Sequence, residues 1–153
     1  MTATRRSGGS SASSLSLALL VLRVAAGGAL LVHGLQKLLV VTPAAFTAGL
    51  AAQGLPVPTL LGWLLITGEV ALGALLLVGL VTRPAAGLAA GMLALVYLSQ
   101  HLLPRGFVAD GAGGLEGEPA FLLLAMALAL SATGPGRFAL DGTRATSGGG
   151  LRG

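Results

Sequence analysis

The chain has 153 residues, of which 54% are hydrophobic and only 9% are charged, and its mean hydropathy is +0.90. Soluble domains carry roughly 25% charged residues, so this composition excludes a soluble core of this size. The formal net charge is +4, but the Lys and Arg residues are scattered at the ends of apolar blocks, which excludes a nucleic-acid-binding patch. Cysteine is absent, which excludes disulfides, thiolate metal sites and thiol chemistry.

The apolar residues come in long blocks, without the two-residue alternation of a membrane barrel. The chain is therefore predicted to be an all-α, polytopic membrane protein. Residues 1–13 are small and polar, and we expect a disordered cytoplasmic arm there. A secretory signal is the rival interpretation, because Arg5 and Arg6 precede an apolar run. Arg23 interrupts that run, which favours a retained first helix.

The first helix is predicted over residues 14–40. At about 100° per residue, His33 falls at the margin of one face of this helix. The face itself carries two basic residues, two glycines and a leucine: Arg23, Gly27, Leu30, Gly34 and Lys37. Its glycines would allow a neighbouring backbone to come close along that face.

A short helix is predicted after the first one. Thr42 and Pro43 are typical of an N-cap and a first-turn proline, and Gly54 closes the segment. The segment is too short to span a membrane, and Phe46 and Leu50 lie four residues apart. We therefore expect an interfacial helix that forms a lid over the bundle.

The second spanning helix is predicted over residues 59–81, with Glu69 in its middle. Between residues 54 and 82 no other side chain is ionisable. A carboxyl at the centre of a membrane helix costs roughly 2.5–3.5 kcal/mol on insertion scales, so it should face protein or water and have a partner. Gly62 and Gly73 share its face, so the carboxylate side is also the side of closest helix approach.

Two further helices are predicted over residues 84–103 and 118–133. The short turn at Thr82, Arg83 and Pro84 makes the third helix antiparallel to the second. Glu118 opens the fourth helix, and the glycines at 134–136 end it. Every proline lies at a boundary of these segments, as helix geometry requires. The result is an antiparallel four-helix transmembrane bundle over residues 14–141, followed by a disordered cytoplasmic tail, 142–153.

The distribution of Lys and Arg predicts the orientation. With both termini in the cytoplasm, the outer side has only Lys37 and Arg105. The inner side then holds six arginines: Arg5, Arg6, Arg83, Arg137, Arg144 and Arg152. Arg137 and Asp141, four residues apart, are expected to form a small structural cap on this inner face.

An ordered set of short motifs along the chain resembles the DoxX family of small four-helix bacterial membrane proteins. The set is Arg23, Gly27, His33-Gly34, Lys37, Gly54-Leu55-Pro56, Gly68-Glu69, Gly73, Gly79-Leu80, Thr82-Arg83 and the segment 134–141. The resemblance covers residues 17–141 and implies a bundle in the bacterial cytoplasmic membrane. Relatives include a small membrane subunit of thiosulfate:quinone oxidoreductase and a mycobacterial membrane subunit associated with oxidative-stress enzymes, but the family name itself supplies little chemistry.

Arg23 and Glu69 are the first candidate pair for the intramembrane polar site. Arg23 lies ~12 Å and Glu69 ~15 Å from the inner ends of their predicted helices. These matching depths predict a buried salt bridge that fixes helix register. In the sharper alternative, Glu69 carries protons or binds a ligand, with a pKa raised by burial.

The remaining candidates lie toward the outer side of the predicted bundle. Lys37 is expected to extend to the membrane interface and do nothing else. His33 could approach Glu69, or join His101 and Glu118 in a cluster that holds a quinone headgroup, relays a proton or binds a divalent metal. We assign no metal, and the ~7 Å offset between the two histidines disfavours bis-histidine haem.

Two functional hypotheses follow. In the first, the chain is a small subunit of a membrane redox complex that interacts with quinone or anchors a partner oxidoreductase. In the second, it is a non-enzymatic membrane scaffold. The sequence holds no dinucleotide fingerprint, P-loop or serine nucleophile motif, so an autonomous enzyme is not expected and no catalytic residue is assigned. Quinone is the only cofactor considered for the first role, and the chain could also associate with further copies of itself.

Overall fold

The protein is described by a computed structural model over residues 8–102 and 117–141, with side chains described from residue 12. Six helical elements make up these ranges: α1 Gly8–Leu39, α2 Pro43–Ala52, α3 Pro58–Val78, α4 Thr82–Tyr97, the π-helix η1 Leu98–Leu102 and α6 Glu118–Thr133. The described residues form no strand, so the all-α prediction is confirmed.

Three helices are long and apolar enough to cross a membrane: Ala12–Leu39, Pro58–Val78 and Thr82–Leu102, the last joining α4 and η1. The apolar helices α2 and α6 are shorter. The 16 residues of α6 extend about 24 Å, against ~30 Å of hydrocarbon. Helix length therefore supports three of the four predicted membrane spans. The structure supports a membrane protein, but it does not by itself establish a bundle of four spanning helices.

Two predicted helix ends differ from the structure by three residues or more. α1 begins at Gly8, six residues before the predicted start, so residues 8–13 are helical and not part of a disordered arm. The Ser16 hydroxyl donates to the Ala12 carbonyl at 2.9 Å in this first section. α3 ends at Val78 and not at residue 81, because Gly79 adopts a left-handed conformation with φ 73°. The amides of Gly79 and Leu80 both donate to the Leu75 carbonyl, which closes the helix end.

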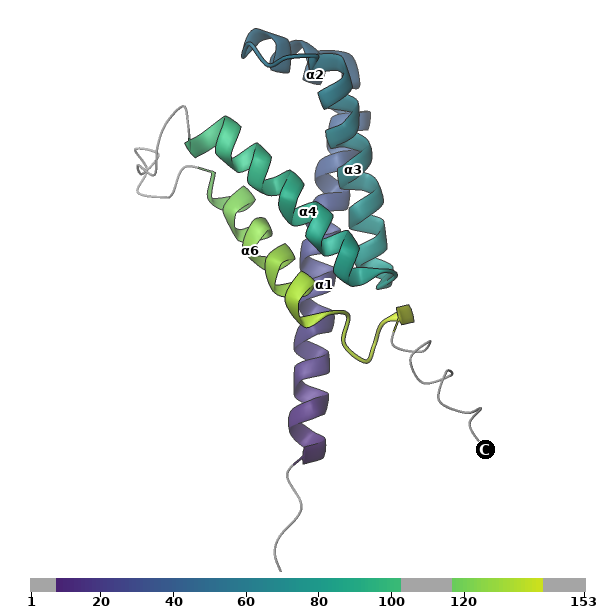
Figure 1. Cartoon of the computed structure of the whole chain (residues 1–153). Coiled ribbons are helices and arrows are strands. Elements are labelled where there is room, and N and C mark those ends of the chain that lie inside the picture. The colour runs from purple at the N-terminus through teal and green to yellow at the C-terminus, as the bar shows by residue number, and fades with distance from the viewer. Residues whose placement is uncertain (1–7, 103–116, 142–153) are drawn as a thin grey trace, which may run out of the picture.

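The helices are arranged as two antiparallel pairs, α1 with α3 and α4 with α6 (Figure 1). Glycines bring α1 and α3 together: a Cβ atom added to Gly27 would lie 2.9 Å from the Gly73 carbonyl oxygen, and one added to Gly73 would lie 2.6 Å from the Leu31 nitrogen. Such contacts leave no room for a methyl group. The sequence-predicted close approach along this face is therefore confirmed.

The second pair is packed through small side chains. α4 buries Ala85, Ala86, Ala89 and Ala90 in a cluster that also includes Ala127 of α6. α1 and α3 contribute Ala26, Leu30 and Leu76 to the same cluster. Most of its members lie toward the α3–α4 turn, which we call the turn end. The opposite end, which holds α2 and η1, is called the α2 end.

Candidate functional site

Lys37 of α1 and Glu69 of α3 form an ion pair inside the protein. The Lys37 Nζ atom lies 2.6 Å from Oε1 and 2.5 Å from Oε2 of the carboxylate. The Lys37 side chain is 22% exposed and that of Glu69 only 9%. Lys37 therefore does not simply extend to the interface, and this prediction was wrong.

The close approach of α1 and α3 brings the Lys37 side chain within reach of the Glu69 carboxylate. Gly34, one turn before Lys37, packs directly on α3: a Cβ atom there would lie 2.9 Å from the Val70 nitrogen and 3.0 Å from the Glu69 Cβ. Without a side chain at position 34, the α1 backbone lies against Glu69. The lysine side chain can then fold back onto the carboxylate.

Arg23 does not pair with Glu69, so the first candidate for the intramembrane salt bridge was wrong. Its guanidinium lies at the turn end, where Nη1 donates to the Pro135 carbonyl at 2.9 Å and Nη2 to the Phe138 carbonyl at 3.0 Å. The depth argument failed because it assumed that both helices end at the same level. α1 instead projects past the turn end (Figure 1), which places Arg23 beside Gly79 of the α3 terminus.

Asp141 completes the packing of the turn end. Its carboxylate accepts hydrogen bonds from the backbone amides of Val81 at 2.9 Å and Thr82 at 2.8 Å, and from the Thr82 hydroxyl at 3.1 Å. These amides lie at the start of α4, so Asp141 caps that helix. The expected structural cap is therefore built by Asp141 on α4, and Arg137 is exposed.

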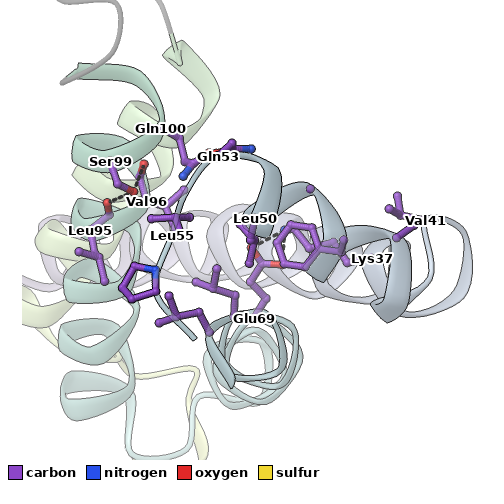
Figure 2. Close-up of a pocket in the computed structure, with 16 residues that line it drawn as sticks. Lys37, Val41, Leu50, Gln53, Leu55, Glu69, Leu95, Val96, Ser99 and Gln100 are labelled. Carbon is purple, nitrogen blue, oxygen red and sulfur yellow. Dashed lines mark hydrogen bonds and ion pairs between the residues drawn. The ribbon is translucent and has the colours of Figure 1, made fainter. Parts of the chain in front are cut away.

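A cavity of about 550 Å³ opens next to the ion pair at the α2 end. Figure 2 shows Lys37 and Glu69 at one side of it, below Leu50. Its walls come from five elements and the α2–α3 loop, and apolar side chains form most of its lining: Val41, Ala45, Phe46, Leu50, Leu55, Pro56, Leu61, Leu65, Leu95 and Val96. An apolar cavity with a few polar groups is the usual form of a small-molecule site.

α2 forms one wall of this cavity. The Thr42 hydroxyl accepts a hydrogen bond from the Ala45 amide at 3.3 Å, which confirms the predicted N-cap. The helix rests on Gly62 of α3, where an added Cβ atom would collide with Thr47. The Phe46 ring faces the ion pair, with its centroid 5.5 Å from the Lys37 Nζ atom.

A second polar group of side chains lies across the cavity from the ion pair. It consists of Gln53, at the end of α2, with Ser99 and Gln100 of η1 (Figure 2). Sequence reasoning missed all three, because their meeting depends on how α2 and the helix of α4 and η1 pack around the cavity, which no residue pattern marked. π-helical turns are rare and occur frequently at functional sites.

His33, His101 and Glu118 do not line the cavity. His33 is exposed on α1, and Glu118 is exposed in the first turn of α6. His101 packs beside Tyr97, with ring centroids 5.9 Å apart, and a Cβ atom added to Gly117 would collide with its ring. The structure thus brings His101 to the start of α6 and leaves His33 on another surface. Over the residues described, no three His, Cys, Asp or Glu side chains form a group suited to a metal ion.

Comparison with known proteins gives one match. A family model described as DoxX matches residues 18–102, which is more than half of the chain. The matched range contains α2, α3, α4, η1 and most of α1, and so includes every residue that lines the cavity. No curated protein and no solved structure matches the chain.

Proposed function

This chain belongs to the DoxX family of membrane proteins, and we propose that it is a small membrane subunit that binds a quinone at the α2 end and presents it to a partner oxidoreductase. The observation that carries the proposal is the Lys37–Glu69 ion pair at the wall of an otherwise apolar cavity. Ionisable groups within membrane spans are costly and usually functional.

The shape and chemistry of the cavity favour a quinone headgroup. Its volume of about 550 Å³ falls in the range of small-molecule sites. Leu95 lines the cavity and is also 59% exposed on a membrane-span helix. The opening therefore includes an apolar surface from which a lipid-dissolved molecule can enter.

Lys37 supplies the polar recognition. An ammonium group carries three N–H donors and no acceptor, and two of them are directed at the Glu69 oxygens. The third can donate to a quinone carbonyl oxygen. Reduction of a quinone to a quinol takes up two electrons, which the partner oxidoreductase would supply, and two protons. Lys37 can donate one proton to the oxygen that it contacts and regain it from water, and water supplies the second proton at the other oxygen.

Binding of a short-tailed quinone to the purified chain in nanodiscs tests the proposal. We expect saturable binding that Lys37→Met abolishes and that His33→Ala leaves unchanged, because His33 is exposed and outside the cavity. The paired variant Lys37→Met with Glu69→Leu removes both charges and should also fail to bind. Equal binding by this paired variant and the natural chain would overturn the proposal.

A membrane scaffold is the second candidate function, and one observation favours it. The first turns of α1 project beyond the turn end (Figure 1) and expose Leu15, Leu17 and Val21 by 60%, 56% and 61%. A projecting apolar helix offers contact area to another membrane protein. A mild-detergent pull-down from native membranes tests this role. Here Leu17→Ser with Val21→Ser should lose the partner while quinone binding is retained.

For both functions we propose the bacterial cytoplasmic membrane as the location, with the turn end on the cytoplasmic side. Arg83 and Arg137 lie at the turn end, and positively charged residues accumulate on the cytoplasmic side of membrane proteins. The cavity then faces the outer half of the bilayer. In the quinone role, this orientation places the partner oxidoreductase on the outer side.

A further inference from the structure

The cavity has two polar ends separated by apolar walls. The Lys37–Glu69 ion pair forms one end, and Gln53 with Ser99 and Gln100 forms the other (Figure 2). Leu50 and Leu55 lie between them. A ligand that fills this space therefore contacts polar groups at both of its ends.

The donors at the second end are the two glutamine amides. The Ser99 hydroxyl already donates to the Leu95 carbonyl at 2.8 Å, so its oxygen is left as an acceptor. Gln53 and Gln100 form no side-chain hydrogen bond within the part of the chain that the structure describes. Their amide N–H groups are therefore available to an acceptor in the cavity.

Gln100 lies in the π-helical turn η1 and lines the cavity. In η1 the hydrogen bonds span five residues, which widens the turn relative to an α-helix. Gln100 lies about one turn beyond Leu95 and Val96, which also line the cavity. Tyr97, the last residue of α4, packs against Phe121 of α6, with ring centroids 5.7 Å apart. This packing fixes the rotation of η1 and hence the direction of Gln100.

We propose that the cavity selects a para-quinone through both of its carbonyl oxygens, one held by Lys37 and the other by the side-chain amide of Gln100 with Gln53 beside it. This inference rests on the proposed function and adds its ligand class and specificity residues. Quinone oxygens are acceptors only, and both ends of the cavity offer donors. A ring with a single carbonyl leaves the donors at one end of the cavity without an acceptor. The loss of this hydrogen bond lets the site discriminate such a ring from a quinone.

The test compares two ligands that differ in one carbonyl: a naphthoquinone and a tetralone that carry the same alkyl tail. The single tryptophan, Trp63, does not line the cavity, so quinone binding is followed by equilibrium binding of a radiolabelled quinone to the nanodiscs, with empty nanodiscs as the blank. Tetralone affinity is then measured by displacement of the quinone. In the natural chain in nanodiscs we expect the quinone to bind about fivefold more tightly than the tetralone, the ratio that one neutral hydrogen bond supplies.

The decisive variants change the glutamines. Gln100→Leu with Gln53→Leu should weaken quinone binding alone and bring the two affinities together. Gln36→Leu is the matched control, because Gln36 is exposed on α1 and outside the cavity, and it should preserve the fivefold ratio. Size-exclusion chromatography checks that each variant is folded. If Gln100→Leu does not fold, Gln100→Asn is used in its place. Its side chain is one carbon shorter, so its amide should no longer reach the ligand and the preference for quinone over tetralone should be lost.

The outcomes separate this inference from the proposed function. Quinone binding that requires Lys37 but keeps its preference over tetralone in the glutamine variants would overturn the inference and leave the proposed function in place. Equal binding of both ligands by the natural chain would do the same. No saturable binding of the quinone by the natural chain would overturn both.

Discussion

Lys37 lies two residues before the end of α1, yet its ammonium group contacts Glu69 about halfway along α3. The two helices are therefore staggered: α3 continues beyond the end of α1 at the α2 end, and α1 projects past α3 at the turn end (Figure 1). The space above the end of α1 is the space that α2 and the cavity occupy. The stagger thus creates the candidate site and places a charge pair at its wall.

The ion pair should matter most when only one member is removed. We expect Lys37→Met to destabilise the protein by about 3–5 kcal/mol, because Glu69 is left charged and buried without its partner. Adding Glu69→Leu to this variant should recover most of the loss. Unfolding by sodium dodecyl sulfate in mixed micelles measures both changes. Equal stability of the single and paired variants would show that the carboxylate does not depend on Lys37.

Two neighbouring glycines of α1 provide a matched test of the close helix contact. Gly27→Ala should destabilise the protein by about 1–3 kcal/mol, because its methyl group would overlap the α3 backbone at Gly73. Gly28 has no atom within 4 Å of an added Cβ, so Gly28→Ala should be neutral or stabilise the helix by up to about 1 kcal/mol. The same unfolding measurement applies. Similar effects at both positions would contradict the packing of α1 on α3.

Arg23 and Arg137 allow the same comparison at the turn end. Arg23 is 1% exposed and satisfies two backbone carbonyls, so Arg23→Gln should cost about 1–3 kcal/mol by leaving buried acceptors without donors. Arg137 is exposed, and Arg137→Gln should change little. Thermal unfolding in detergent compares the two. Unchanged stability of Arg23→Gln would mean that the segment after α6 is held by other contacts.

Removal of the Asp141 cap is a separate test of the same end. Asp141→Ala takes away the acceptor for two amides at the start of α4 and should cost about 1 kcal/mol, with a range of about 0.5–2. Asp141→Asn keeps a side-chain acceptor and should retain most of the stability. Hydrogen exchange at the Val81 and Thr82 amides reports the change directly, and equal exchange in all three proteins would exclude the cap.

The absence of cysteine from the sequence makes the proposed orientation easy to test. Gln53→Cys lies at the α2 end and Arg137→Cys at the turn end, and both natural residues are exposed. A membrane-impermeant maleimide should label position 53 in intact cells and position 137 only after permeabilisation. The reverse labelling pattern would invert the bundle and move the cavity to the cytoplasmic side.

The sequence supports the fold more fully than the site. Proline and glycine positions located the helix ends well, and α6 begins and ends where it was predicted. The predicted inward face of α3 is also confirmed, since Gly62, Glu69 and Gly73 are all buried. These features follow from local chemistry and helical period, which a single sequence contains.

The partner of Glu69 could not be found in the same way. A choice between Arg23 and Lys37 depends on the axial stagger of α1 against α3, which is set by where Gly27 and Gly34 meet the α3 backbone. The sequence gives the positions of these glycines, but it does not give the axial register between the two helices. Gln100 was missed for a related reason, because its place at the cavity depends on how the helix of α4 and η1 packs against α6, where Tyr97 contacts Phe121.

The shared alanine-rich cluster joins α1, α3, α4 and α6, and most of it lies toward the turn end, whereas the opposite end contains the cavity. Dense packing resists deformation, and regions with few buried contacts open more readily. The distance between α3 and η1 can therefore adjust to whatever lies between them while their other ends stay fixed. Ligands of different thickness would be accommodated by a small change in the tilt of the α4–α6 pair, while every helix keeps its secondary structure.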